Sequence, residues 1–138
     1  MPVRYTVSSN GLFIHAVAHG LLKSDDIYQY INDISQDDRV KPGFSELFDV
    51  REMTESQVIP ELFGDFRKLI RDDPKRKRGG KLAIVVRTNS SFNKAQQYER
   101  SVMSDVQNVI VFNDVHTAKI WLGVTEVRSA PSAEPDRG

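Results

Sequence analysis

The sequence predicts a single-domain α/β protein with a mixed, mostly parallel five-stranded sheet and about four helices. Segments with the apolar pattern of strands alternate with segments that have the spacing of helices, an order typical of parallel sheets with helical crossovers. An Asn-Gly pair between the first two strand-like segments indicates a hairpin, which makes the first strand antiparallel. The length of 138 residues suits one hydrophobic core.

The beginning of the chain predicts a hairpin followed by a helix. Residues 4–8 and 12–18 are the two arms of the hairpin, and the Asn-Gly pair between them tolerates the positive φ angles of its turn. A helix is expected next, because residues 24–26 (Ser-Asp-Asp) offer N-cap side chains and apolar residues then recur on one face. These apolar residues are Ile27, Tyr30, Ile31 and Ile34. Pro42 and Gly43 mark the break after this helix.

The middle of the chain predicts a strand, an amphipathic helix and a second strand. Residues 44–50 form a short apolar run beside a turn, which indicates a buried strand. Residues 57–72 have the clearest helical pattern, with Pro60 confined to the first turn. The apolar positions of this helix are Ile59, Leu62, Phe63, Phe66, Leu69 and Ile70. Residues 81–87 are apolar without alternation, which predicts a central strand with parallel neighbours and helices on both faces.

The last part of the chain predicts a helix, a strand and a short helix. An Asn-Ser-Ser segment offers helix caps, and the inward stripe that follows is Phe92, Ala95, Tyr98 or Glu99, and Val102. Residues 109–112 form the last strand, and Asp114 caps the short helix after it. The domain therefore spans residues 1–124. Residues 125–138 lack apolar periodicity, and we expect them to form a flexible tail.

Composition and charge argue against several function classes. Lys plus Arg and Asp plus Glu both number 19, so the net charge is zero and no global field favours nucleic acid. The chain has no cysteine, which removes disulfides, thiolate catalysis and cysteine-bound metals. No apolar run approaches the roughly 18 residues that a membrane span requires. We therefore expect a cytoplasmic protein.

Histidines and a basic cluster are candidates for chemistry, and each has a simpler interpretation. His15 and His19 are separated by about 13 Å along a strand, too far for one metal ion. No motif sets a nucleophile beside His116, so we expect no catalytic residue and no enzymatic activity. The basic residues 75–78 could contact nucleic acid or an acidic partner, but they also complement the dipole of the preceding helix. We expect no metal, no cofactor and no nucleic-acid partner.

The end of the domain carries a pattern shared with a known family. Residues 111–122 read Val-Phe-Asn-Asp-Val-His-Thr-Ala-Lys-Ile-Trp-Leu, a strand followed by an acidic cap and Ala-x-x-Trp-Leu. With a strand that ends at Asp49 and the apolar strand 81–87, this pattern resembles the SpoIIAA-like proteins. These are related to the STAS anti-sigma-factor antagonists and, more loosely, to the CRAL-TRIO lipid-transfer fold. The resemblance covers about residues 3–123. It implies a four-helix, mixed-sheet domain that in many members has no assigned activity.

The resemblance also raises a phosphorylation switch, for which this sequence lacks the acceptor. STAS antagonists carry an Asp-Ser phosphoacceptor pair in the chain after this strand, and Gln57 and Val58 stand at that place. The nearest hydroxyls belong to Thr54 and Ser56, and neither follows an aspartate. We therefore expect no phosphorylation switch at Ser56.

The sequence leaves two hypotheses for the function. The first is a non-enzymatic regulatory or protein-interaction module of the SpoIIAA or STAS type, with a protein partner or a second copy of the chain. The second is a binder or carrier of a small apolar, lipid-like molecule in a slot between the helix 57–72 and the sheet. The helix that follows the strand 81–87 could also receive an anion at its start, because the free N–H groups and the helix dipole favour a negative charge there. The candidate contacts are Phe63, Phe66, Ile70, Arg87, Asn89, Ser90 and Ser91.

Overall fold

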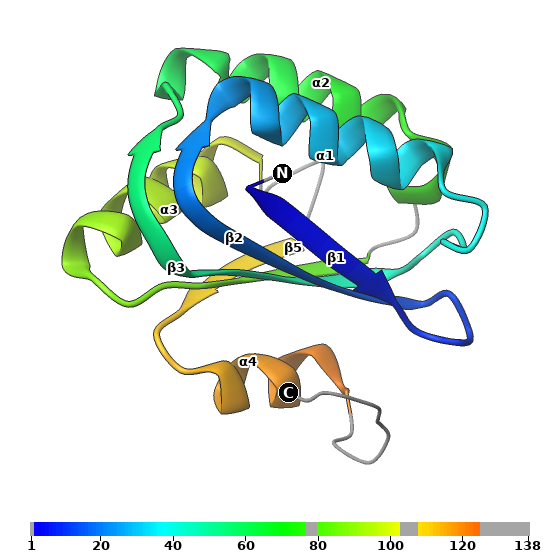
Figure 1. Ribbon diagram of the computed structural model, residues 1–138. Helices are drawn as coiled ribbons and strands as arrows, with labels where there is room; N and C mark the ends of the chain where they lie inside the picture. Colours follow the sequence, from blue (N-terminus) through cyan, green and yellow to red (C-terminus); the bar gives the residue numbers. More distant parts are fainter. Residues whose placement is uncertain (1, 77–79, 103–107, 125–138) are drawn as a thin grey trace.

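In the computed structural model, five strands form one mixed sheet with helices on both of its faces (Figure 1). The structure describes residues 2–76, 80–102 and 108–124. The strands are β1 (Val3–Val7), β2 (Phe13–Lys23), β3 (Ser45–Gln57), β4 (Lys81–Val85) and β5 (Asn108–Phe112). They lie in sequence order across the sheet; β1 is antiparallel to β2, and the other neighbours are parallel. The predicted α/β class and the antiparallel first strand are confirmed.

The helices are distributed unequally over the two faces of the sheet. They are α1 (Ser24–Gln36), α2 (Phe63–Asp72), α3 (Asn89–Val102) and α4 (Val115–Leu122). From β2 to β5 each strand is added on the same side of the previous one, so right-handed crossovers place α1, α2 and α3 on one face. The fourth helix follows the last strand and covers the opposite face (Figure 1). The described part of the chain holds no helix with the length and apolar character that crossing a bilayer needs.

Two strands are longer than the sequence predicted, and one helix is correspondingly shorter. β2 runs to Lys23 instead of residue 18, and β3 runs to Gln57 instead of residue 50. The additional residues pair with each other, and Lys23 lies opposite Gln57. The helix predicted over residues 57–72 therefore starts only at Phe63, after a short 3-10 turn at Pro60–Leu62. Strand pairing between distant segments outweighs the local helical pattern here, because it gives the polar end of β3 its backbone partners.

The later start of α2 also changes which side chains it buries. Phe63, Phe66 and Ile70 face the sheet, at spacings of three and four residues. The predicted apolar stripe was wrong at two positions: Ile59 lies before the helix and is 50 % exposed, and Leu69 is 44 % exposed on its outer side. A helix that turns Phe66 and Ile70 inward must turn Leu69 outward, since consecutive residues differ by about 100° around the axis.

The paired ends of β2 and β3 bend toward the face of the sheet that α1, α2 and α3 cover (Figure 1). The β2–β3 register shifts twice, between Val17 and His19 and between Gly20 and Leu21. Such bulges bend a strand and increase its twist. Gly20 has a φ of 71°, a region that residues with a side chain rarely adopt, so the bend depends on a glycine at this position. The bent ends form a wall beside the helical layer.

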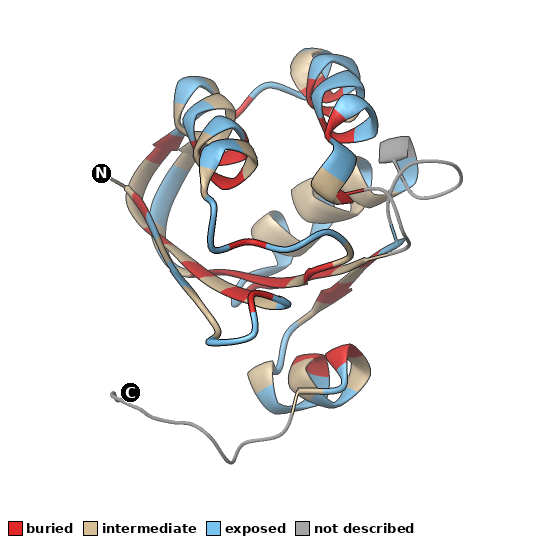
Figure 2. Ribbon diagram, turned by 90° about the vertical axis from the view of Figure 1, so that its right-hand side faces the viewer, coloured by how far each residue is buried: buried red, intermediate tan, exposed pale blue. Residues whose placement is uncertain are grey.

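Two separate groups of buried side chains lie on the two faces of the sheet, and buried residues line the inner sides of the helices (Figure 2). The larger group lies under α1, α2 and α3, and the smaller one lies under α4. β4 contributes to both groups, with Leu82 and Ile84 in the larger one and Ala83 and Val85 in the smaller one. The parallel neighbours and two-sided burial predicted for this strand are therefore confirmed, although the strand ends at Val85 and not at residue 87.

Amide hydrogen exchange tests the double coverage of β4. We expect the amides of residues 82–86 to be among the slowest in the protein, because β4 is paired on both edges and the Val86 N–H still donates to the Phe112 carbonyl at 2.9 Å. Exchange can be followed by NMR at neutral pH. Rates close to those of an unstructured peptide of the same sequence would contradict the arrangement.

Candidate functional site

A cavity of about 490 Å³ lies between the sheet and the helices α1, α2 and α3. This volume is within the ~300–1,000 Å³ that is typical of small-molecule sites. Most of its wall is apolar, with side chains from three helices and three strands. The large apolar side chains of the wall include Ile31, Phe48, Phe63, Phe66, Ile70 and Ile84.

Above the cavity, α2 is connected to its neighbouring helices by aromatic contacts. The Phe66 ring meets the Tyr28 ring of α1 edge to face, with 4.9 Å between centroids. The Phe63 ring meets the Tyr98 ring of α3 in the same way at 5.4 Å. The Tyr28 hydroxyl also donates to Asp65 at 3.2 Å. These contacts join α2 to α1 and α3, and the cavity lies between these helices and the sheet.

One end of the cavity reaches the surface between the end of β3 and the start of α3. The lining residues there are polar and exposed, namely Thr54, Glu55, Thr88 and Ser90. The opening arises because β4 pairs with β3 only as far as Asp49, whereas β3 continues to Gln57 along the bent wall. Beyond that point, residues at the start of α3 line the cavity. The cavity is therefore apolar inside with a polar entrance.

The other end of the cavity carries a buried ion pair. Arg76 donates from Nη1 to Oε1 of Glu46 at 2.6 Å, and the Tyr30 hydroxyl donates to Oε2 of Glu46 at 2.6 Å. The side chains of Glu46 and Arg76 are each 3 % exposed, and all three residues line the cavity. The guanidinium of Arg76 also lies 5.0 Å from the centroid of the Phe44 ring. We call Tyr30, Glu46 and Arg76 the inner polar cluster.

Burial and neighbouring charge shift the pKa values of three groups that line the cavity. Burial alone would lower the pKa of Arg76, but the Glu46 carboxylate raises it above its ordinary value, so the guanidinium stays charged. Burial and the Glu46 carboxylate both raise the pKa of the Tyr30 hydroxyl well above 10. Burial likewise raises the pKa of Tyr98, which lines the same cavity. The cavity is therefore lined by the charged guanidinium of Arg76 and by the uncharged phenols of Tyr30 and Tyr98.

The structure brings five of the seven predicted contact residues to one cavity. Phe63, Phe66 and Ile70 line its helical side, and Ser90 and Ser91 line its entrance. The other two, Arg87 and Asn89, are exposed and are not among the residues that line it. The predicted Asn-Ser-Ser cap was wrong by one residue, because the Ser91 N–H donates to Thr88 Oγ1 at 3.1 Å and Thr88 caps α3.

Sequence reasoning missed the inner polar cluster. Arg76 was expected to complement the dipole at the end of the preceding helix, but it is buried against Glu46. A signal was present, since Glu46 falls inside an apolar strand and a buried carboxylate requires a cation or strong donors. The distance of 30 positions between the two residues concealed the partner. Two other members of the predicted basic group, Lys77 and Arg78, lie outside the described residues, as does the predicted tail 125–138.

The hydroxyls nearest to the missing phosphoacceptor lie at the entrance of the cavity. Thr54 and Ser56 both line it, and Ser56 Oγ accepts the Val58 N–H at 3.3 Å. Their position is thus explained by a strand end and a turn. That Ser56 is not a phosphorylation switch stays a prediction.

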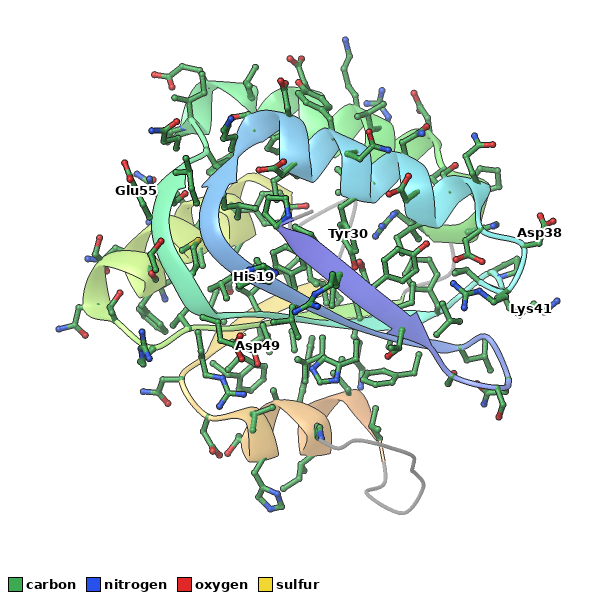
Figure 3. All side chains as sticks on the ribbon, in the orientation of Figure 1. His19, Tyr30, Asp38, Lys41, Asp49 and Glu55 are labelled. Atoms are coloured by element: carbon green, nitrogen blue, oxygen red, sulfur yellow. The ribbon has the colours of Figure 1, made fainter. Side chains whose placement is uncertain are left out.

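Asp49, which lies inside β3, and His116, near the start of α4, are on the opposite face of the sheet. In Figure 3 Tyr30 lies in the space between the sheet and the helices, and Asp49 lies toward α4. Asp49 binds its neighbour Arg51, with Oδ2 2.7 Å from Nη2. Burial raises the pKa of Asp49, but the hydrogen bonds from Arg51 outweigh it and lower the pKa overall. His116 is exposed, and the described residues contain no cluster of three His, Asp or Glu side chains that could hold a metal ion.

Comparison with known proteins identifies the fold and leaves the function open. No family model and no curated protein matches the chain. Among solved structures, an uncharacterized protein of the DUF3478 family from Shewanella loihica PV-4, described as having a SpoIIAA-like fold, is similar with a TM-score of 0.55. The two chains are 16 % identical over 87 % of this chain and 91 % of the other. The domain therefore has a SpoIIAA-like fold, as the resemblance in sequence implied.

Proposed function

We propose that this SpoIIAA-like domain binds a small, mainly apolar molecule in the cavity under α1, α2 and α3, without chemical conversion. The observation that carries the proposal is the cavity itself, with a volume of about 490 Å³ and a mostly apolar wall. An apolar molecule that enters it removes apolar surface from water, at about 25 cal/mol per Å². The exposed polar residues at the entrance give such a molecule a path to the interior.

The lining of the cavity supports binding in preference to catalysis. None of the three histidines, His15, His19 and His116, is among its lining residues. The serine and threonine hydroxyls at the entrance therefore have no imidazole beside them as a general base. The buried carboxylate of Glu46 accepts hydrogen bonds from Arg76 and Tyr30, so its role is structural.

A non-enzymatic interaction module is the alternative function. The buried centre of a protein interface is usually more apolar than the rest of the surface. The large apolar side chains that are most exposed in the described ranges, Leu12, Ile59, Leu69 and Ile120, belong to four different segments of the chain. This scatter favours the ligand proposal. A protein partner, a homodimer and a cytoplasmic location stay predictions.

Binding of a neutral apolar dye such as Nile red tests the proposal. We expect the wild-type protein to enhance its fluorescence, and we expect decanol to displace it. Replacing Ala95, a small residue of the cavity wall on α3, by phenylalanine should weaken dye binding by about tenfold or more, because the ring occupies ligand space.

The matched control is Gln97→Phe on the exposed side of the same helix. It adds the same ring outside the cavity, and dye affinity should remain close to that of the wild type. Circular dichroism and urea denaturation of both variants establish that each is folded. If Ala95→Phe binds the dye as well as Gln97→Phe does, the dye does not occupy this cavity and the proposal fails.

A further inference from the structure

We infer that the ligand in this cavity is an amphipathic acid, whose carboxylate binds Lys94 at the entrance and whose apolar chain lies in the interior. This inference rests on the proposed function, since it names the chemical class of the molecule in the same cavity. It also gives the orientation of that molecule. The charged end stays near the surface, where it keeps part of its hydration, and the apolar end is buried.

Two cationic side chains line the cavity in the described part of the chain, Arg76 at the inner end and Lys94 on α3. Arg76 already has two carboxylates beside it, with Nη1 2.6 Å from Oε1 of Glu46 and Nε 3.6 Å from Oδ2 of Asp73. Within residues 2–76, 80–102 and 108–124, no carboxylate forms an ion pair with Lys94. The acid group of a ligand therefore gains more from Lys94 than from the arginine.

The position of Lys94 in α3 brings its ammonium to the entrance. Lys94 lies one helical turn after Ser90, which lines the entrance. Side chains of a helix lean toward its N-terminus, so the long side chain of Lys94 extends back toward Ser90 and Ser91. Lys94 is half-buried, an arrangement in which the methylene stem covers apolar wall and the charge stays near water. The cation thus lies where the cavity meets solvent.

Two hydroxyls at the entrance provide further donors for a carboxylate. Ser56 Oγ accepts the Val58 N–H at 3.3 Å, and Thr88 Oγ1 accepts the Ser91 N–H at 3.1 Å. A hydroxyl that accepts through its oxygen still has its own hydrogen to donate. A carboxylate only accepts, so it complements these hydroxyls and the Lys94 ammonium together. A ligand with an ammonium group would instead meet a like charge.

The acidic residue that borders the entrance, Glu55, carries its charge on the outer side of the wall. Leu22 and Ser56 are register partners in β2 and β3, and both line the cavity. Because successive side chains alternate between the two faces of a strand, the preceding pair, Leu21 and Glu55, points to the other face. In Figure 3 Glu55 projects outward from the bent end of β3. Its carboxylate accepts from Gln57 Nε2 at 3.4 Å and does not face the interior.

Displacement of Nile red by ligands of equal chain length tests this inference. The probes are decanoate, decanol and decylammonium, measured with the full chain at neutral pH and below their micelle concentrations. We expect the wild type to bind decanoate about tenfold or more tightly than decylammonium. In Lys94→Met the affinity for decanoate should fall about tenfold, and that for decanol should change by less than about twofold, because methionine keeps an apolar stem without the charge.

The matched control is Lys68→Met on α2, an exposed residue that is not among those lining the cavity. It removes the same charge from the protein, and it should keep the wild-type ratio of decanoate to decanol affinity. Circular dichroism establishes that both variants are folded.

The possible failures distinguish the inference from the proposed function. If Lys94→Met keeps the same ratio of decanoate to decanol affinity as Lys68→Met, the inference is overturned, and the binding of decanol leaves the proposed function intact. Tighter binding of decylammonium than of decanoate by the wild type would overturn the inference as well. If the wild type binds none of the three probes, the proposed function and the inference both fail.

Discussion

Replacing Arg76 by methionine is expected to lower the free energy of unfolding by about 3–5 kcal/mol. The side chain is 3 % exposed and is bound to Glu46, which is equally buried. Methionine fills much of the same volume but leaves the Glu46 carboxylate in the interior without its cation. Removal of one partner of a buried pair is costly for this reason, even where the intact pair contributes little. Urea denaturation with linear extrapolation measures the loss.

Two further variants distinguish the buried charge from a general effect of losing an arginine. The double variant Glu46→Met with Arg76→Met also removes the Glu46 carboxylate, and it should recover part of the lost stability. The recovery stays partial because the buried Asp73 carboxylate, 3.6 Å from Arg76 Nε, still loses its cation. Arg39→Met removes a guanidinium that binds Asp37 at 2.7 Å but is 65 % exposed, so it should cost less than about 1 kcal/mol. Equal losses for Arg76→Met and Arg39→Met would show that burial of the pair is unimportant.

Replacing Phe66 by alanine is expected to lower the free energy of unfolding by about 3 kcal/mol, at the lower end of the ~3–5 kcal/mol observed for buried aromatic residues. The residue is 1 % exposed and contacts the Tyr28 ring, so the loss is large. The loss stays at the lower end of this range because part of the Phe66 ring borders the cavity, where truncation removes few packing contacts. The same urea measurement applies. A loss above about 5 kcal/mol would indicate a closely packed environment on all sides.

A pair of isoleucines provides a matched control for this reasoning. Ile34 of α1 is fully buried and is not a lining residue, whereas Ile70 of α2 is 3 % exposed and lines the cavity. Truncation to alanine should cost about 4 kcal/mol at Ile34 and about 2 kcal/mol at Ile70. Because the chemical change is identical, the difference between the two losses in unfolding free energy reports the packing around each side chain. The reverse order would contradict an open space under α2.

The elements that the sequence predicted well are those with short-range signals. The apolar run of β4 shows no alternation, and the strand is buried on both faces. The Asp114 carboxylate accepts the Thr117 N–H at 2.9 Å, as expected for a cap at the start of α4. Gly123 ends that helix with a φ of 75°. In each case the physical cause lies within a few residues of its effect, so a local pattern contains it.

The elements that the sequence did not predict depend on segments that are distant in the chain. The end of β3 looks like the start of a helix until its pairing with the end of β2 is known, and that pairing delays α2 to Phe63. The bend that walls the cavity needs both strands and the positive φ of Gly20.

By itself, then, the sequence determined the α/β class, the antiparallel first strand, the inward-facing Phe63, Phe66 and Ile70 of α2, and the SpoIIAA-like resemblance. Only the tertiary structure decided where α2 begins, where the cavity opens and that Arg76 is buried against Glu46. Apolar spacing and caps act between neighbours in the chain, and they can be recognised in a single sequence. Strand pairing and the neutralisation of a buried charge act between residues that meet only after folding, so their partners become identifiable only in three dimensions.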